Sequence, residues 1–157
     1  MHEILRFDEL LGAIREVVES TEGRRALLEV CRLLKEGVGH YDWVGFYMVD
    51  PGTGGELVLG PYVGEPTEHV RIPFGRGICG QAAERRETFV VDDVSKEGNY
   101  LACSPYVRSE IVVPIFNDRG QLVAELDIDS HTPASFSAED RRFLERVAEL
   151  VSRCISQ

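Results

Sequence analysis

The sequence predicts an α+β domain, in which helices from both ends of the chain pack on one face of an antiparallel sheet and a ligand pocket lies on the other. Three observations predict it: helical periodicity at both termini, strand-like runs between them, and connections too short for crossover helices. We expect one domain over residues 1–157, with helices in 1–38, the sheet and pocket loops in 40–136, and a helix in 137–157.

The helical segments are recognised by apolar residues at steps of three and four. They are Phe7, Leu10, Leu11, Ile14, Val17 and Val18 in the first helix, Leu27, Val30, Cys31 and Leu34 in the second, and Leu144, Val147, Val151 and Cys154 in the last. Gly37 and Gly39 end the second helix, and a capping signal at Ser137–Asp140 begins the last. Between them, strands are expected at YDWVGFYMVD, ELVLGPYV, HVRIP, TFVVDDV, SEIVVPIF and QLVAELDIDS.

Charge and length exclude several classes of protein. The 157 residues carry 17 basic and 27 acidic side chains, a formal charge of −10, which argues against a nucleic-acid partner or an anionic membrane surface. The N-terminus lacks a basic region followed by a continuous apolar stretch, and no apolar run approaches the length of a membrane span. We therefore expect a cytoplasmic protein whose four cysteines are not a disulfide framework.

The four cysteines fall into two kinds. Cys31 and Cys154 lie on apolar helix stripes, which is typical of a cysteine that serves as a small buried hydrophobe. Cys79 lies at an expected helix start, where backbone N–H groups and the helix dipole favour a thiolate. Cys103 precedes Ser104-Pro105, which also reads as a short helix start. From local context, each of these two cysteines is a reactive thiol or a residue that packs a loop against the sheet.

The last two expected strands place acidic residues together. If their turn centres between Asp118 and Arg119, Glu110 pairs with Asp127 and Arg108 with Asp129. Because side chains alternate along a strand, Glu125 shares this face with Asp127 and Asp129.

Like charges across a ladder repel, so such a cluster indicates a site that holds a cation or a neutral carboxyl. The alternative is an ordinary solvated face. A metal site is disfavoured, since no histidine or cysteine stands at ligand spacing beside the acids.

Two further motifs lie near the expected pocket. Trp43 and Tyr47 share a strand face with Gly45, which would leave an apolar wall with room for a small ligand, unless Trp43 simply covers a sheet edge. Residues 75–80, GRGICG, match the dinucleotide pattern G-x-G-x-x-G, but the following helix is short and no second βαβ unit follows. We therefore disfavour a nucleotide site and expect instead a small anion site at the helix start, for example for a carboxylate.

The strings DWVGFY, ELVLGPY, VRIPFGRGICG, LAC, RSEIVVP and LDIDS, in this order, resemble a GAF domain of the free methionine-(R)-sulfoxide reductase family. The resemblance covers about residues 40 to 155. It implies that Cys103 attacks the substrate, that Cys79 matches a second cysteine of the family, and that Glu110, Asp127, Asp129, Trp43 and Tyr47 surround the substrate. His69 stands where the family carries a third cysteine, which can act as the resolving thiol.

The resemblance implies reduction of free L-methionine-(R)-S-oxide to methionine without a bound cofactor. An external thiol reductant such as thioredoxin would be the partner, and a homodimer through the terminal helices is a further expectation from the resemblance. In this chemistry a carboxyl kept neutral among the acids protonates the sulfoxide oxygen. A non-catalytic GAF domain that senses a small molecule or redox state is the alternative, favoured by the missing third cysteine.

Overall fold

The protein is described here by a computed structural model that covers residues 2–101 and 104–155. The α-helices are α1 (His2–Ser20), α2 (Gly23–Gly37), α3 (Gly77–Arg85) and α4 (Ala138–Val151). The strands are β1 (Trp43–Val49), β2 (Glu56–Val63), β3 (Arg71–Pro73), β4 (Phe89–Val91), β5 (Ser109–Phe116) and β6 (Leu122–Ser130). Short 3-10 turns lie at Val94–Lys96 and Ser152–Cys154.

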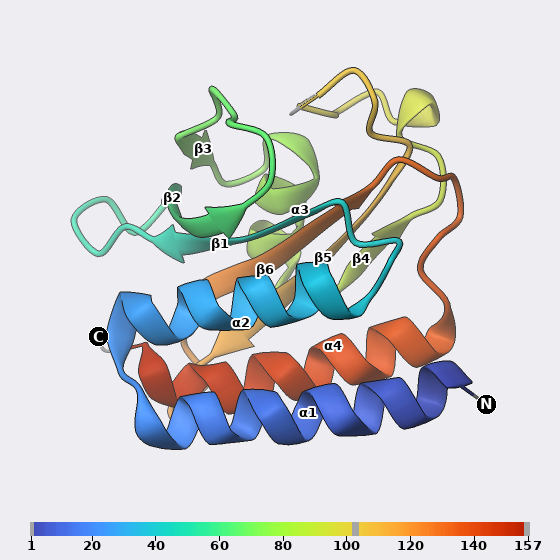
Figure 1. The fold of residues 1–157 in the computed structure, drawn as a ribbon. Coiled ribbons are helices and arrows are strands. Elements are labelled where there is room, and N and C mark those ends of the chain that lie inside the picture. Colours follow the sequence, from blue (N-terminus) through green and yellow to red (C-terminus); the bar gives the residue numbers. More distant parts are fainter. Residues whose placement is uncertain (1, 102–103, 156–157) are drawn as a thin grey trace.

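The strands form one antiparallel sheet in the order β3-β2-β1-β6-β5-β4, which confirms the expected α+β architecture. Helices α1, α2 and α4 lie together on one face of this sheet, and α3 lies on the other (Figure 1). The larger core fills the space between the three helices and the alternate residues of the central strands, among them Val44, Phe46, Ile111, Leu126 and Ile128. A second, smaller core lies under α3.

The β5–β6 hairpin has a different register from the one expected. Glu110 pairs with Asp129, and Val112 pairs with Asp127, a shift of two residues. The reason is a wider turn over residues 117–121, which is closed by a hydrogen bond from Asn117 N to Gln121 O, together with an irregularity beside Phe116. A shift of two residues keeps every side chain on its expected face. The prediction that the acidic residues share one face is therefore confirmed, whereas the predicted pairing of Glu110 with Asp127 is wrong.

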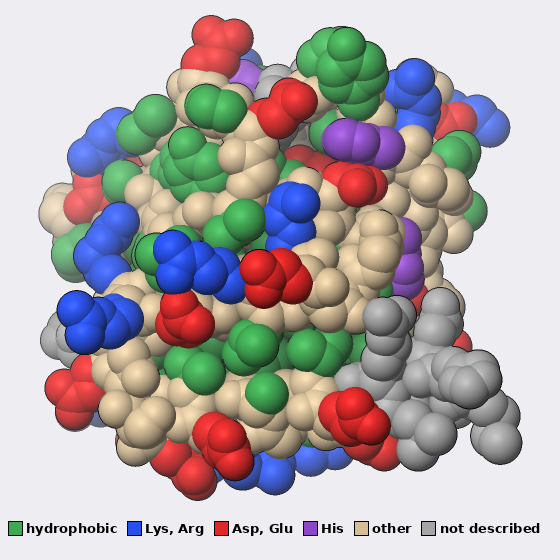
Figure 2. Space-filling view, in the orientation of Figure 1, with side chains coloured by type: hydrophobic (Ala, Val, Ile, Leu, Met, Phe, Trp, Pro, Cys, Tyr) green, Lys and Arg blue, Asp and Glu red, His purple; other side chains and the backbone are tan. Residues whose placement is uncertain are grey.

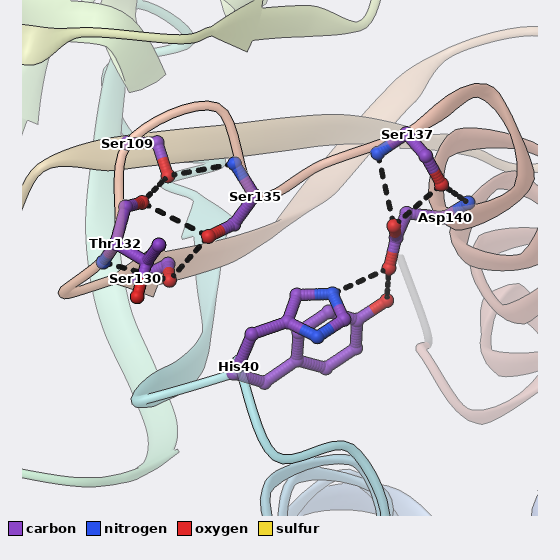
Figure 3. A network of polar contacts seen from close by, with 8 residues as sticks. His40, Ser109, Ser130, Thr132, Ser135, Ser137 and Asp140 are labelled. Atoms are coloured by element: carbon purple, nitrogen blue, oxygen red, sulfur yellow. Dashed lines mark hydrogen bonds and ion pairs between the residues drawn. The ribbon is translucent and has the colours of Figure 1, made fainter. Parts of the chain in front are cut away.

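A network of polar contacts joins the segment before β1 to the start of α4 (Figure 3). Ser137 and Asp140 form the expected capping box, in which each side chain accepts a hydrogen bond from the backbone N–H of the other. The Asp140 carboxylate also accepts from the Tyr41 hydroxyl at 2.6 Å and pairs with His40 Nε2 at 2.9 Å. Asp140 is thus a buried acid that supports the fold.

The two cysteines expected on apolar helix stripes, Cys31 and Cys154, have different surroundings. Cys31 is buried in the larger core, as expected, and burial raises the pKa of its thiol. Cys154 instead lies past the end of α4, in a 3-10 turn, where it is half-buried and its sulfur contacts Thr21 O at 3.9 Å. Burial and the charge of Glu22 raise its pKa. Neither thiol is poised to react, because a raised pKa keeps a thiol protonated.

On the face drawn in Figure 2, acidic side chains alternate with lysine and arginine. Among the described residues, no helix is both long enough and apolar enough to cross a membrane.

Candidate functional site

The acidic residues of β6 face the smaller core and are buried. Glu125, Asp127 and Asp129 are at most 1 % exposed, and Glu110 on β5 is 5 % exposed. Within the described part of the chain, both oxygens of Glu125, both of Asp129 and Oδ1 of Asp127 have no hydrogen-bond partner. A solvated face is therefore excluded. Buried carboxyl oxygens that lack partners are costly, so their presence here indicates a functional site.

Burial decides the protonation of these acids. It raises the pKa of Asp127, and hydrogen bonds with Glu110 and Cys79 offset this only in part. Burial together with the charge of Asp127 raises the pKa of Asp129 and of Glu125 well above the usual range. Because the charged form is disfavoured in this environment, these carboxyls keep their protons to a higher pH than free carboxyls do.

Cys79 reaches the acids because α3 begins close to the sheet. The glycines of the G-x-G-x-x-G motif allow this geometry. Gly75 and Gly77 have φ angles of +92° and +65°, and a Cβ on Gly80 would lie 2.6 Å from Pro73 O. These glycines let the loop turn sharply into α3, so that Cys79 Sγ and one carboxylate oxygen each of Glu110 and Asp127 lie within 4.8 Å of one another.

A small cavity of about 10 Å³ lies at this cluster, which is room for about one water molecule. Its lining includes Tyr47, His69, Cys79, Glu110 and Asp127. The Tyr47 hydroxyl donates to His69 O at 2.9 Å, which fixes the segment before β3 over the cavity. The residue at the expected resolving-cysteine position therefore lies in the same cavity as Cys79.

The aromatic residues of β1 are arranged differently from the expectation. Trp43 and Tyr47 do share the pocket face, with ring centroids 6.5 Å apart. The space over Gly45 is filled by the Trp43 indole itself, since a Cβ on Gly45 would meet that ring at 2.4 Å. Trp43 also stacks on Tyr62 and donates from Nε1 to Glu65 O. Tyr47 lines the cavity, whereas Trp43 is not among its lining residues.

The expected nucleophile, Cys103, lies outside the described residues. The Ser104-Pro105 sequence after it forms a turn and not a helix start: Tyr106 N donates to Ser104 Oγ at 3.2 Å, and Val107 N donates to Ser104 O. Arg108 is exposed, and its guanidinium donates to Pro105 O and Val107 O. It is not paired with Asp129, whose cross-strand partner is Glu110.

Sequence reasoning missed the role of Asn99. Its side chain accepts from Gly77 N at 2.9 Å and donates to Gly75 O at 2.8 Å, which ties the irregular segment before residue 101 to the start of α3. The Gly77 N–H group is therefore already satisfied, which weakens the expected anion site at this helix start. The only local signal was the Gly98-Asn99 pair, typical of a turn. Only the family resemblance placed Cys79 in one site with the carboxylates, because the three residues are remote in sequence and local patterns do not bring them together.

Comparisons with known proteins agree with this fold. The GAF domain family matches residues 22–156. The chain is 35% identical over 130 residues to the free methionine-R-sulfoxide reductase of Escherichia coli, covering 83% of this chain and 76% of that protein. It is 37% identical over 147 residues to GAF domain-containing protein A of Dictyostelium discoideum, covering 93% and 90%. An X-ray structure of the Neisseria meningitidis free methionine-R-sulfoxide reductase, in complex with its substrate, superposes with a TM-score of 0.87 at 41% identity, covering 94% of this chain and 86% of that chain.

Proposed function

This chain belongs to the GAF domain family, and from its similarity to free methionine-R-sulfoxide reductases we propose that it reduces free L-methionine-(R)-S-oxide to L-methionine. The observation that carries the proposal is the buried group of one thiol and two carboxylates, from Cys79, Glu110 and Asp127, in a single cavity. The cavity is smaller than the amino acid, so we expect substrate binding to displace lining side chains.

The first step needs an acid, because a sulfoxide oxygen is a poor leaving group until it is protonated. In the proposed step, the Cys103 thiolate attacks the sulfoxide sulfur while a neutral carboxyl of the Glu110/Asp127/Asp129 cluster protonates the oxygen. The oxygen is transferred to Cys103 as a sulfenic acid, and methionine leaves with its sulfur reduced by two electrons. The raised pKa of Asp129 supports the acid role, since a carboxyl must hold its proton near neutral pH to donate it.

The second step regenerates the thiol. A second thiol, from Cys79 or from an external reductant, attacks the sulfenic acid sulfur, forms a disulfide and releases water. A dithiol such as thioredoxin then reduces this disulfide. His69 occupies the position of the family's third cysteine and has no thiol, so the choice lies between Cys79 and the external reductant.

The substrate's ammonium group offers a partner for the acids. A free amino acid carries this positive charge, and Oδ1 of Asp127 has no hydrogen-bond partner among the described residues. An ammonium ion hydrogen-bonded to buried carboxylates offsets their cost of burial. This supports a free amino acid as the substrate.

Methionine formation from the two free sulfoxide epimers tests the proposal. We expect mass spectrometry to show methionine from the R epimer, with dithiothreitol or thioredoxin as reductant, and none after Cys103→Ser. Turnover that survives Cys103→Ser would contradict the role of Cys103. Thermal stabilisation by the sulfoxide without turnover under any thiol reductant would instead identify a GAF sensor domain.

A further inference from the structure

The cluster in the cavity has the composition of a site for a thiophilic cation. Cys79 comes from α3, Glu110 from β5 and Asp127 from β6, and their sulfur and oxygen atoms all lie within 4.8 Å of one another. All three side chains are buried. The fold therefore brings together one soft and two hard donors from three separate elements, in a place shielded from water.

These distances suit zinc. A zinc ion binds thiolate sulfur at about 2.3 Å and carboxylate oxygen at about 2.0–2.2 Å, so its ligand atoms lie roughly 3–4 Å apart in a tetrahedral site. Atoms that already lie within 4.8 Å need only small side-chain rotations to reach that arrangement. Magnesium and calcium prefer oxygen ligands alone, whereas a thiolate ligand favours zinc.

A second observation favours a cation beside Asp127. Asp127 is 1 % exposed and lines the cavity, yet its Oδ1 has no hydrogen-bond partner among the described residues. A buried carboxylate oxygen without a donor is usually paired with a positive charge or a metal. The cavity of about 10 Å³, which Asp127 lines, has room for one ion.

A further residue of a zinc-binding type lines the same cavity. His69 lines the same cavity, and its imidazole is a common zinc ligand. Its ring nitrogens do not belong to the group of donor atoms that lie within 4.8 Å of one another, so the His69 side chain would have to move to bind the same ion. The replacement of the family's third cysteine by His69 thus keeps a residue that can bind zinc at this position.

From these contacts we propose that the reduced protein binds one Zn²⁺ ion between Cys79, Glu110 and Asp127, and that the bound ion excludes the sulfoxide from the cavity. Zinc is then an inhibitor and not a cofactor of the proposed reaction. The site requires the Cys79 thiolate, so a protein in which Cys79 is oxidised to a disulfide does not hold the ion. The inference goes beyond the proposed function, since the metal site exists whether or not the chain turns over the sulfoxide.

Zinc titration of the reduced full-length chain tests the proposal without any substrate. In competition with a chromogenic chelator, we expect one tightly bound Zn²⁺ per chain. Because loss of a residue that only orients a metal ligand costs about 10–100-fold in affinity, Cys79→Ser and Asp127→Asn should each weaken binding by at least about tenfold. Cys154→Ser, at a half-buried cysteine outside the cavity, and Asp118→Asn, at an exposed acid of the hairpin turn, are matched controls that should retain the wild-type affinity.

A spectroscopic measurement on the wild type keeps the test valid if a variant fails to fold. Cobalt in place of zinc should give a thiolate-to-metal charge-transfer band, and excess free methionine-(R)-S-oxide should remove it. If Cys79→Ser and Cys154→Ser bound zinc with the same affinity, or if the cobalt spectrum lacked a thiolate band, the proposal that Cys79 is a metal ligand would be overturned. Zinc that binds but leaves the apparent KM for the sulfoxide unchanged would overturn the exclusion of substrate.

Discussion

Two groups of buried carboxyls in this protein have opposite surroundings. Asp140, at the start of α4, accepts hydrogen bonds from Tyr41 and Ser137 and pairs with His40 (Figure 3). Glu125, on the pocket face of β6, has no hydrogen-bond partner among the described residues, and the neighbour whose hydrogen bond partly offsets burial at Asp129 is another acid, Glu110. Burial would raise the pKa of Asp140, but its hydrogen bonds together outweigh this and lower it, whereas the pKa values of Glu125 and Asp129 are raised.

This difference in hydrogen bonding leads us to expect that Asp140 contributes to stability and that the acids of β6 contribute to function. A buried charge that is fully hydrogen-bonded helps to hold two elements together, so its loss should weaken the fold. A buried carboxyl without partners costs free energy of folding, and a chain that keeps several of them in one place keeps them for their chemistry. Substitutions in the two groups should therefore have different consequences. Four predictions test this, ordered from the largest expected effect to the smallest.

The largest effect is expected on activity, from Asp127→Asn. If the cluster supplies the proton, kcat/KM for the free R epimer should fall about 10²–10⁴-fold, the usual contribution of a general acid, while the melting temperature is not lowered. A coupled assay with a thiol reductant measures this. Asp118→Asn, in the exposed hairpin turn, is the control and should keep full activity. Full activity in Asp127→Asn would remove the acid role from this residue.

Asp140→Ala should have the largest effect on stability. It removes the cap of α4 and leaves the buried Tyr41 hydroxyl without its acceptor, so the free energy of unfolding should fall by about 2–4 kcal/mol. Urea denaturation gives this value. Glu139→Ala, at the exposed neighbouring position, is the control and should change it by less than about 0.5 kcal/mol. A loss no larger than that of the control would show that Asp140 does not support the fold.

Glu125→Met should stabilise the protein. Methionine fills nearly the same volume without a polar group, so the free energy of unfolding should rise by about 1–3 kcal/mol. Glu125→Gln keeps a buried polar group and should change stability much less. The measurement is again urea denaturation of both variants. A loss of stability in Glu125→Met would mean that Glu125 has a partner in solution, and the contrast between the two groups would be weakened.

The smallest effect is a pH dependence at Asp140. Its pKa in the folded state is lowered, so its contribution to stability is present above the pKa of the unfolded chain, about 3.9, and is lost as pH falls through the folded pKa. The stability difference between wild type and Asp140→Asn should therefore be largest near neutral pH and shrink on acidification. Denaturation at a series of pH values measures it. A difference that grows toward low pH would contradict the assignment.

Much of the fold could be predicted from the sequence because its signals are local. The periodicity of α2, the capping box at Ser137 and the alternation along β6 depend on neighbouring residues only. The acidic face was predicted for the same reason, although the pairing of Glu110 was wrong, because the geometry of the turn over residues 117–121 is not set by alternation. The approach of Cys79 to Asp127 depends on how α3 packs over the sheet, which local patterns do not encode.

The rate of methionine formation from free methionine-(R)-S-oxide in a pair of variants, Asp129→Asn and Asp140→Asn, tests the central claim most directly. At a temperature where both chains are folded, we predict that Asp129→Asn loses at least about 100-fold in kcat/KM without loss of stability. Asp140→Asn should be less stable and keep nearly full activity. An active Asp129→Asn chain beside an inactive but folded Asp140→Asn chain would contradict the division of the two buried groups into one for chemistry and one for the fold.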